Sequence, residues 1–214
     1  MYKCFDEEIG KKVAKDLLAI DAIKLQPSNP FHWASGWKSP IYCDNRLSLS
    51  FPALRTEIKL LLVAAIKANY PTVEAIAGVA TAGIPQGALI AEEMGLPFIY
   101  VRSKSKGHGL SNQIEGHVVP NQKVVVIEDL VSTGGSSLAA VEALTASKIT
   151  VLGMACIFTY GFGIAEENFK MANVDLIYLS EYQLLIQQAI EDGQIEGSLL
   201  DTLNSWRNDP SNWG

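Results

Sequence analysis

VVVIEDLVSTGGSS, residues 124–137, joins three unlike pieces of sequence. Four β-branched residues are followed by two adjacent acids, Glu128 and Asp129, and then by a turn rich in serine, threonine and glycine. The apolar run predicts a buried strand over 123–128, and the residues after the turn predict a helix over 136–147. The stretch therefore predicts a strand that ends on two carboxylates, and a turn whose glycines let a ligand come close to the backbone.

The sequence on both sides repeats this strand-and-helix pattern. Apolar segments predict strands over 73–80, 97–102, 149–158 and 174–180, and amphipathic or capped segments predict helices over 5–20, 51–70, 85–95 and 181–192. The last twenty residues are expected to be helical and then frayed. Strands that are apolar throughout and alternate with helices are typical of a parallel sheet covered on both faces. The predicted fold class is α/β, and ligands of such sheets bind beyond the carboxyl ends of the strands.

Two segments do not fit this alternation. Residues 31–42 predict two short strands around a serine-glycine turn. Residues 103–120 are polar, contain three glycines and lack periodicity. A loop of about 18 residues is uncommon in a compact domain and is either a lid over a site or a disordered insertion. A lid is favoured by a group of basic residues in a stretch without acids: Arg102, Lys104, Lys106 and His108.

Composition limits the class of protein. The chain has 214 residues and a net charge of −6, with 48% hydrophobic and 19% charged residues, which is ordinary for one globular domain. No apolar run reaches the ~20 residues of a membrane span, and the acidic balance argues against a protein that mainly binds nucleic acid. Cys4, Cys43 and Cys156 show no CxxC spacing, so we expect neither a disulfide nor a zinc site. The start has no apolar leader, and we expect a cytoplasmic protein.

The turn over residues 132–137 allows two interpretations. The free N–H groups and the positive end of a helix dipole form an anion site, which suits a phosphate. The alternative is an ordinary helix cap at Ser136 or Ser137. Two nucleotide-binding motifs are excluded, because no lysine follows Gly135 as a Walker A loop requires, and the chain contains no GxGxxG.

The paired acids also leave alternatives open. Two carboxylates at the end of a buried strand cost desolvation free energy unless a partner uses them. They suit a general acid–base pair, a metal ion or the vicinal hydroxyls of a sugar, and a structural or solvated pair is the alternative. Directly before an anion-binding turn, a sugar phosphate satisfies both features. Two like charges side by side also favour a cation such as Mg²⁺.

The order of four apolar residues, two acids, two apolar residues and a glycine-rich turn resembles the phosphoribosyl-pyrophosphate (PRPP) motif of type I phosphoribosyltransferases. Residues 100–116 resemble the mobile catalytic loop of orotate phosphoribosyltransferases, residues 31–46 their hood over the base, and residues 78–85 their pyrophosphate loop. The resemblance implies the type I phosphoribosyltransferase fold, with a central mostly parallel sheet flanked by helices, a small N-terminal hood and a long mobile catalytic loop.

The resemblance also implies a division of the chain. We expect one phosphoribosyltransferase domain over residues 1–214, with a hood over about 1–50, a core over about 51–180 and a C-terminal helical segment over about 181–214.

Roles for individual residues follow from the same resemblance. It implies that Glu128 and Asp129 receive the ribose hydroxyls and that Ser132 contacts orotate. The implied catalytic residues are Arg102, Lys104, Lys106 and His108. The implied PRPP-binding residues are Arg102, Lys106, His108, Glu128, Asp129, Leu130, Val131, Ser132, Thr133, Gly134, Gly135 and Ser136. Mg²⁺ is expected to arrive bound to PRPP, with no protein ligand assigned to it.

Some positions depart from the family pattern. Some members carry basic residues where this chain has Ala34, Ala82, Ser103 and Thr159-Tyr160. Lys104 is a candidate substitute for the lysine absent at 103. The other gaps leave the carboxylate of orotate without its usual partner, and our candidate for that role is Arg46, with Lys38 as the alternative.

The implied activity is transfer of the ribose 5-phosphate of PRPP to orotate, giving orotidine 5'-monophosphate and pyrophosphate in de novo pyrimidine (UMP) biosynthesis. The expected enzyme is a homodimer whose loops are shared across the interface, with no nucleic acid or membrane partner. The alternatives are a phosphoribosyltransferase for another base and a non-catalytic PRPP-sensing regulator of transcription. The regulator would need a basic surface or a winged helix, and the acidic sequence indicates neither.

Overall fold

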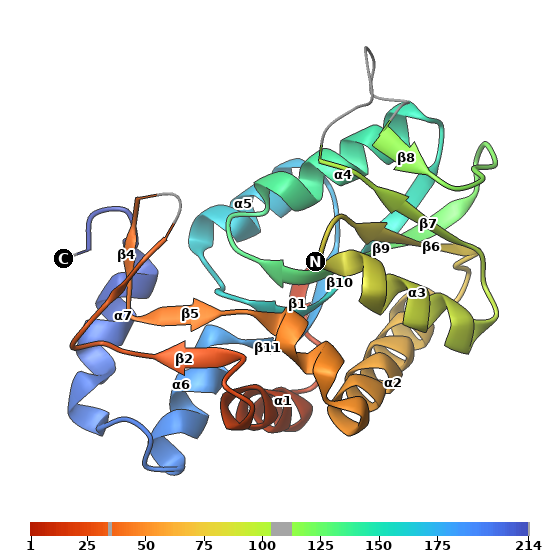
Figure 1. The fold of residues 1–214 in the computed structure, drawn as a ribbon. Coiled ribbons are helices and arrows are strands. Elements are labelled where there is room, and N and C mark those ends of the chain that lie inside the picture. The colour runs from red at the N-terminus through yellow and green to blue at the C-terminus, as the bar shows by residue number, and fades with distance from the viewer. Residues whose placement is uncertain (34–35, 104–112, 214) are drawn as a thin grey trace.

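The computed structural model describes residues 1–33, 36–103 and 113–213. Within them, strands and helices alternate around a central sheet (Figure 1). In spatial order the sheet contains β1 (Tyr2–Cys4), β11 (Leu176–Glu181), β10 (Thr150–Thr159), β9 (Lys123–Val131), β6 (Ala75–Val79), β7 (Phe98–Val101) and β8 (Ile114–Glu115). Neighbouring strands run parallel except β7 and β8. The predicted mostly parallel α/β sheet is confirmed.

Helices cover both faces of this sheet. Their bounds are α1 (Glu7–Ala19), α2 (Pro52–Asn69), α3 (Gly83–Met94), α4 (Gly135–Ala146), α5 (Gly163–Met171), α6 (Tyr182–Glu191) and α7 (Leu200–Asn208). Figure 1 shows α2 and α3 on one face and α4 and α5 on the other. All residues of β6 are buried between these layers, which explains its uninterrupted apolar sequence. None of the helices in the described ranges combines the length and apolar character needed to span a bilayer.

Local sequence signals set several helix ends. The Asp6 carboxylate accepts a 2.9 Å hydrogen bond from the backbone N–H of Ile9 and so caps α1. Pro52 occupies the first turn of α2, where its missing N–H leaves no hydrogen bond unmade. Gly95 adopts the left-handed conformation that ends α3, as predicted. However, α3 begins at Gly83 rather than at Pro85, because proline is tolerated anywhere in the first turn.

The segment expected to form the hood divides between two places. Its first part joins the main body, because β1 pairs with β11 at the edge of the central sheet. The next part forms two small antiparallel sheets, β2 (Ile23–Leu25) with β5 (Ile41–Cys43) and β3 (Phe31–His32) with β4 (Lys38–Ser39). The short 3-10 helix η1 (Asn45–Ser50) then leads into α2. The two strands predicted within 31–42 are confirmed as β3 and β4, and Figure 1 shows β4 beside α7.

The chain connections change direction between β6 and β9. From β6 the chain passes through α3 to β7 on one side, and from β9 it passes through α4 to β10 on the other. In open parallel sheets, ligands bind outside the carboxyl ends of the strands at such a switch point. The candidate residues that follow β6, β7 and β9 therefore share one edge of the sheet.

Candidate active site

Strand β9 carries the two acids past the point where one neighbouring strand stops. It pairs with β6 as far as Ile127, opposite Gly78, but with β10 as far as Val131, opposite Thr159. The prediction that this strand ends at Glu128 is therefore wrong by three residues, because β10 continues to supply hydrogen-bond partners. Glu128 and Asp129 lie just beyond the point where β6 ends, and Gly83 at the start of α3 packs closely against the backbone of Ile127 and Glu128.

The Glu128 side chain is buried, with 6% of the residue's surface exposed. Its carboxylate accepts hydrogen bonds from the Ser137 hydroxyl and from the backbone N–H of Asp129, each at 3.1 Å. Burial, and then the charge of Asp129, raises the pKa of Glu128 well above its ordinary value. A carboxyl in this position is stabilised by a ligand that brings hydroxyl donors or positive charge.

Asp129 is less buried and is held through its backbone. The Asn45 side-chain amide, which is buried, donates a 2.7 Å hydrogen bond to the Asp129 carbonyl oxygen. Burial raises the pKa of the Asp129 carboxyl, and the nearby charge of Arg46 acts in the opposite direction. Because Asn45 and Arg46 begin η1, the end of the hood segment is attached directly to the paired acids.

The turn after β9 has the geometry of an anion site. Gly134 has a φ of 84°, and none of the described side chains caps the first N–H groups of α4. These donors are left for a ligand. Gly134 occupies the cap position, so the alternative prediction of a helix cap at Ser136 or Ser137 is wrong. The Ser137 hydroxyl instead donates to Glu128.

Helix α5 supports this turn from outside. The side-chain amide of Asn168 donates a 2.9 Å hydrogen bond to the carbonyl oxygen of Thr133. A Cβ atom added at Gly134 would lie 2.9 Å from Cε2 of Phe169, closer than such atoms normally approach. The conformation of the turn therefore depends on two residues of a neighbouring helix.

Arg102 lies at the same edge, at the end of β7. It shares a cavity of about 150 Å³ with Val79, Ala80, Val101, Ser103, Gln113, Ser136, Ala139 and Ala140. The cavity brings Arg102 together with Ser136 of the turn and Ala80 of the segment after β6. The Arg102 guanidinium also forms a 3.3 Å ion pair with Glu115. The candidate residues Lys104, Lys106 and His108 lie outside the described residues.

A more apolar cavity of about 280 Å³ adjoins the turn. It is lined by His32, Trp33, Tyr42, Cys43, Leu130, Ser132 and Tyr160. The rings of Trp33 and Tyr160 have centroids 5.0 Å apart and form an aromatic wall. Ser132 belongs both to this cavity and to the glycine-rich turn. A flat ring bound against the aromatic wall would therefore lie next to a ligand held by the turn.

Arg46 is not among the described residues that line this cavity; 61% of its side chain is exposed, and its charge acts on Tyr42 and Asp129. Its guanidinium donates two hydrogen bonds to the Asp44 carboxylate, at 2.6 and 2.9 Å. The hydrogen bonds from Arg46 lower the pKa of Asp44 below its ordinary value. Lys38, the alternative partner for a ligand carboxylate, is exposed on β4.

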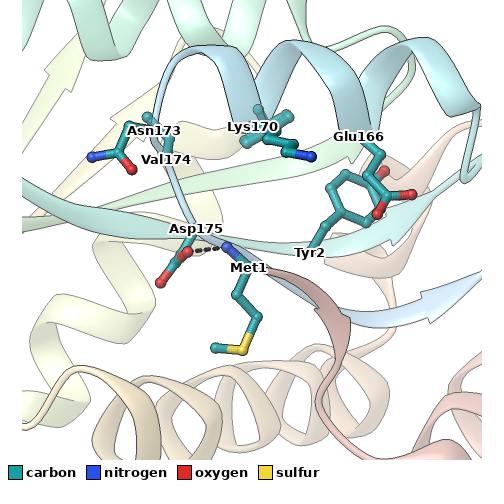
Figure 2. Close-up of a pocket in the computed structure, with 8 residues that line it drawn as sticks. Met1, Tyr2, Glu166, Lys170, Asn173, Val174 and Asp175 are labelled. Atoms are coloured by element: carbon teal, nitrogen blue, oxygen red, sulfur yellow. Dashed lines mark hydrogen bonds and ion pairs between the residues drawn. The ribbon is translucent and has the colours of Figure 1, made fainter.

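Figure 2 shows another cavity, of about 380 Å³, beside α5 and the amino-terminal ends of β1 and β11. Its side chains have mixed charge, and the Met1 ammonium group pairs with the Asp175 carboxylate. The described residues that line it include neither the paired acids nor the turn nor Arg102. Chemistry that requires those groups therefore belongs to the carboxyl edge of the sheet.

The cysteines are poor candidates for nucleophiles. Cys156 is buried within β10, and burial raises the pKa of its thiol well above the ordinary value. Burial, followed by the charge of Asp129, does the same to the pKa of Cys43. Across the described part of the chain, no three or more His, Cys, Asp or Glu side chains are grouped to hold a metal ion.

Sequence patterns assigned no role to four individual residues of this edge, although Trp33 and Asn45 lie in the 31–46 segment that resembles the hood. Asn45 and Asn168 each hold a backbone carbonyl of the predicted motif, and Trp33 and Tyr160 form the aromatic wall. Asn168 lies in α5, which no pattern predicted. For Asn45, the available signal was a polar side chain between an expected strand and Pro52, which is too common to mark a site.

Paired acids, a glycine-rich turn and an adjoining aromatic cavity at the switch point of a parallel sheet define a phosphoribosyltransferase. In agreement, the phosphoribosyl transferase domain family matches residues 55–184, more than half of the chain. The orotate phosphoribosyltransferase of Cytophaga hutchinsonii is 57% identical over 203 residues, which cover 95% of this chain and 97% of that protein. The corresponding protein of Porphyromonas gingivalis is 54% identical and covers 96% and 98%. This chain belongs to the orotate phosphoribosyltransferase family.

Solved structures share the fold. The crystal structure of orotate phosphoribosyltransferase from Aeropyrum pernix superposes with a TM-score of 0.73 and 28% identity, covering 86% of this chain and 99% of that one. UMP synthase of Leishmania donovani gives a TM-score of 0.76 with 25% identity, covering 92% of this chain and 42% of the longer one. The type I phosphoribosyltransferase fold predicted from the sequence is confirmed for the central sheet and its helices.

Proposed function

We propose that this chain is an orotate phosphoribosyltransferase, which transfers the ribose 5-phosphate of PRPP to orotate and forms orotidine 5'-monophosphate and pyrophosphate in pyrimidine biosynthesis. The observation that carries the proposal is the position of Ser132, which belongs to the glycine-rich turn and also lines the aromatic cavity. A ligand with its phosphate in the turn has its other end next to that cavity. A ribose 5-phosphate joined to a planar base has this shape.

We assign PRPP to the carboxyl edge of the sheet. Glu128 and Asp129 would accept hydrogen bonds from the ribose hydroxyls, which offsets the cost of burying two carboxyl groups. The 5-phosphate would bind the N–H groups and hydroxyls of the turn. The proposed turn residues are Leu130, Val131, Ser132, Thr133, Gly134, Gly135 and Ser136.

The reaction needs charge stabilisation more than proton transfer. A ring nitrogen of orotate attacks the anomeric carbon of the ribose, and the bond from that carbon to pyrophosphate breaks, with its electron pair leaving on the pyrophosphate. The proton that the ring nitrogen carried is lost as the new bond forms and passes to the departing pyrophosphate or to solvent. Arg102 faces the turn across a shared cavity and is placed to stabilise the leaving group. From the resemblance we assign Lys104, Lys106 and His108 to the same task. Exclusion of water by this segment would protect PRPP from hydrolysis.

Mg²⁺ is the proposed cofactor. Bound with PRPP, it would neutralise part of the pyrophosphate charge. Burial raises the pKa values of the Glu128 and Asp129 carboxyl groups, so their ionised forms lack stabilisation in the unliganded protein. A cation carried by the ligand would supply that stabilisation. Oxygen donors of this kind are those that Mg²⁺ prefers.

Orotate would occupy the aromatic cavity. Trp33 and Tyr160 offer ring faces to the pyrimidine, and Ser132 offers a hydroxyl at the side nearest the ribose. The orotate carboxylate needs a cation, and Arg46 is our candidate because its charge already acts on Asp129. A negatively charged base with an Arg46 contact would be favoured over uracil, which lacks the carboxylate.

The test of this function measures the consumption of three bases. Purified protein is mixed with PRPP and Mg²⁺ and with orotate, uracil or hypoxanthine, and base loss is followed by absorbance and pyrophosphate release. We expect turnover with orotate alone. Turnover of hypoxanthine or uracil instead would establish another base specificity, and PRPP binding without turnover of any base would favour the regulator.

We also propose a cytoplasmic homodimer in which each loop acts at the neighbouring site, as the resemblance implies. The three cysteines, all within the described residues, carry free thiols, which agrees with a reducing compartment. Mixing Lys106→Ala with Asp129→Asn protein tests the shared site. Hybrid dimers should regain one intact site, and no gain of activity after confirmed subunit exchange would contradict the sharing.

A further inference from the structure

The C-terminal helix α7 contacts the back of the aromatic wall. Trp206 is fully buried, and its ring packs edge-on against both wall residues, with centroids 5.6 Å from Trp33 and 5.8 Å from Tyr160. The ring centroids of Phe162 and Tyr182 lie 5.3 and 5.2 Å from that of Trp206. Among the described residues, those that line the cavity include Trp33 and Tyr160 but not Trp206. Trp206 therefore lies behind the wall and does not face the ligand space.

A hydrogen bond connects the same side chain to the hood. The indole N–H of Trp206 donates to the backbone carbonyl of Lys38 at 3.0 Å. Lys38 lies in β4, opposite His32 of β3, and His32 lines the aromatic cavity. Trp206 is thus connected to the cavity by two routes, through the rings of Trp33 and Tyr160 and through β4, which pairs with the strand that carries His32.

A second residue of α7 contacts the wall. Arg207 Nε donates to the carbonyl oxygen of Tyr160 at 3.4 Å. Helix α7 is itself held at its middle, because the Tyr182 hydroxyl donates to the carbonyl oxygen of Leu203 at 3.1 Å. The hood strands and α7 both lie outside residues 55–184, which match the phosphoribosyl transferase domain family. The hood strands and α7, which lie outside the family domain, therefore meet beside the aromatic cavity.

We infer that α7 is a specificity element for the base, and that Trp206 is a positioning residue that sets the spacing of the Trp33–Tyr160 wall. The inference rests on the proposed function, because it assigns the cavity to orotate. It also gives a role to the C-terminal helical segment, which the resemblance places outside the core. The hydrogen bonds that hold the paired acids come from Asn45 and Ser137, and the one that holds the turn comes from Asn168, and none of these residues lies in α7.

Substitution of Trp206 should therefore weaken the binding of orotate and leave the binding of PRPP nearly unchanged. Trp206→Phe keeps an aromatic ring but removes the hydrogen bond to Lys38, so we expect the KM for orotate to rise about threefold to tenfold. Trp206→Leu also removes the aromatic contacts, and we expect a rise of about tenfold or more. In both variants the KM for PRPP should change by less than about twofold. Trp213→Phe, the same chemical change seven residues further along, is the matched control and should leave both constants unchanged.

The experiment measures both KM values and kcat for all four proteins, with circular dichroism and thermal melts to show that each is folded. A selective rise in the KM for orotate supports the inference. Equal rises for the two substrates, or no rise in a folded Trp206→Leu protein, would overturn it while leaving the proposed function intact. If Trp206→Leu does not fold, Trp206→Phe decides by the same criterion. A wild-type protein that does not convert orotate would overturn both proposals.

Discussion

The side-chain amide of Asn168 holds the main-chain carbonyl of Thr133 at 2.9 Å, across the gap between α5 and the glycine-rich turn. The turn contains no long side chain of its own that could fix its shape. Its conformation is instead set by a residue that follows it by 35 positions in the sequence. No described side chain caps the first N–H groups of α4, so these donors are left for a phosphate.

Asn168→Ala should weaken PRPP binding without affecting the base. Loss of one hydrogen bond, worth about 0.5–1.5 kcal/mol, should raise the KM for PRPP about twofold to tenfold. The KM for orotate should stay nearly constant, because Asn168 is not among the described residues of the aromatic cavity. Initial rates at varied PRPP and fixed orotate measure the effect. Glu167→Ala, an exposed neighbour on the same helix, is the control, and an equal change in that variant would refute the interpretation.

Gly134→Ala should destabilise the protein and distort the turn. The φ of 84° disfavours any side chain, and the new Cβ would press on Phe169. We expect a loss of about 1–2 kcal/mol in the free energy of unfolding, measured by urea denaturation. Gly163→Ala, where a Cβ meets nothing within 4 Å, should change it by less than about 0.5 kcal/mol. Similar values for the two variants would show that the turn is not constrained as described.

The pKa of Glu128 predicts a pH dependence of stability in the unliganded protein. Because the pKa is raised in the folded state by burial and by Asp129, the folded protein loses stability as pH rises from the unfolded value of about 4.3 through the raised value. Glu128→Gln removes this loss. The variant should exceed the wild type by about 1 kcal/mol or more at pH 8, and the difference should shrink toward pH 5. Its transferase activity should nevertheless fall.

Urea denaturation at several pH values measures this difference. Glu142→Gln, an exposed carboxyl on α4, is the control and should show no such pH-dependent gain. A Glu128→Gln protein that is less stable than the wild type at pH 8 would contradict the assignment of Glu128 as a destabilised, buried acid.

Two variants distinguish the candidate partners of the orotate carboxylate. Arg46→Gln removes a charge that acts on Tyr42 of the cavity, and loss of a charged hydrogen bond of about 1.5–3 kcal/mol should raise the KM for orotate about 10- to 100-fold. Lys38→Gln should leave it within about threefold. The KM for uracil, if measurable, should not respond to Arg46→Gln, because uracil has no carboxylate. The opposite ranking of the two variants would assign the role to Lys38.

Sequence patterns predicted the parts of the fold that depend on local residues. The central strands after Pro71, the helix closed by Gly95 and the turn at 132–137 follow from apolar runs and glycines that act within a few residues. The resemblance of the 124–137 motif predicted the family, and relatives at more than 50% identity confirm it.

The remaining features depend on contacts between distant segments. Strand β9 runs on to Val131 because β10 lies beside it, and no property of Glu128 or Asp129 reveals that pairing. The short strand β1 exists only because β11 offers an edge, and residues 2–4 show no strand pattern alone. Trp206 and Trp33 lie 173 positions apart in sequence but 5.6 Å apart in space, a contact that no local period encodes. The roles of Lys104, Lys106 and His108 stay predictions.

The central claim is that PRPP binds with its ribose on Glu128 and Asp129. Calorimetric titration of PRPP with Mg²⁺ into wild-type, Asp129→Asn and Glu142→Gln proteins tests it most directly. We predict saturable binding to the wild type and to Glu142→Gln, and an affinity reduced at least about tenfold in Asp129→Asn, since a buried charged hydrogen bond is worth about 1.5–3 kcal/mol. Equal affinity for PRPP in all three proteins would contradict the account.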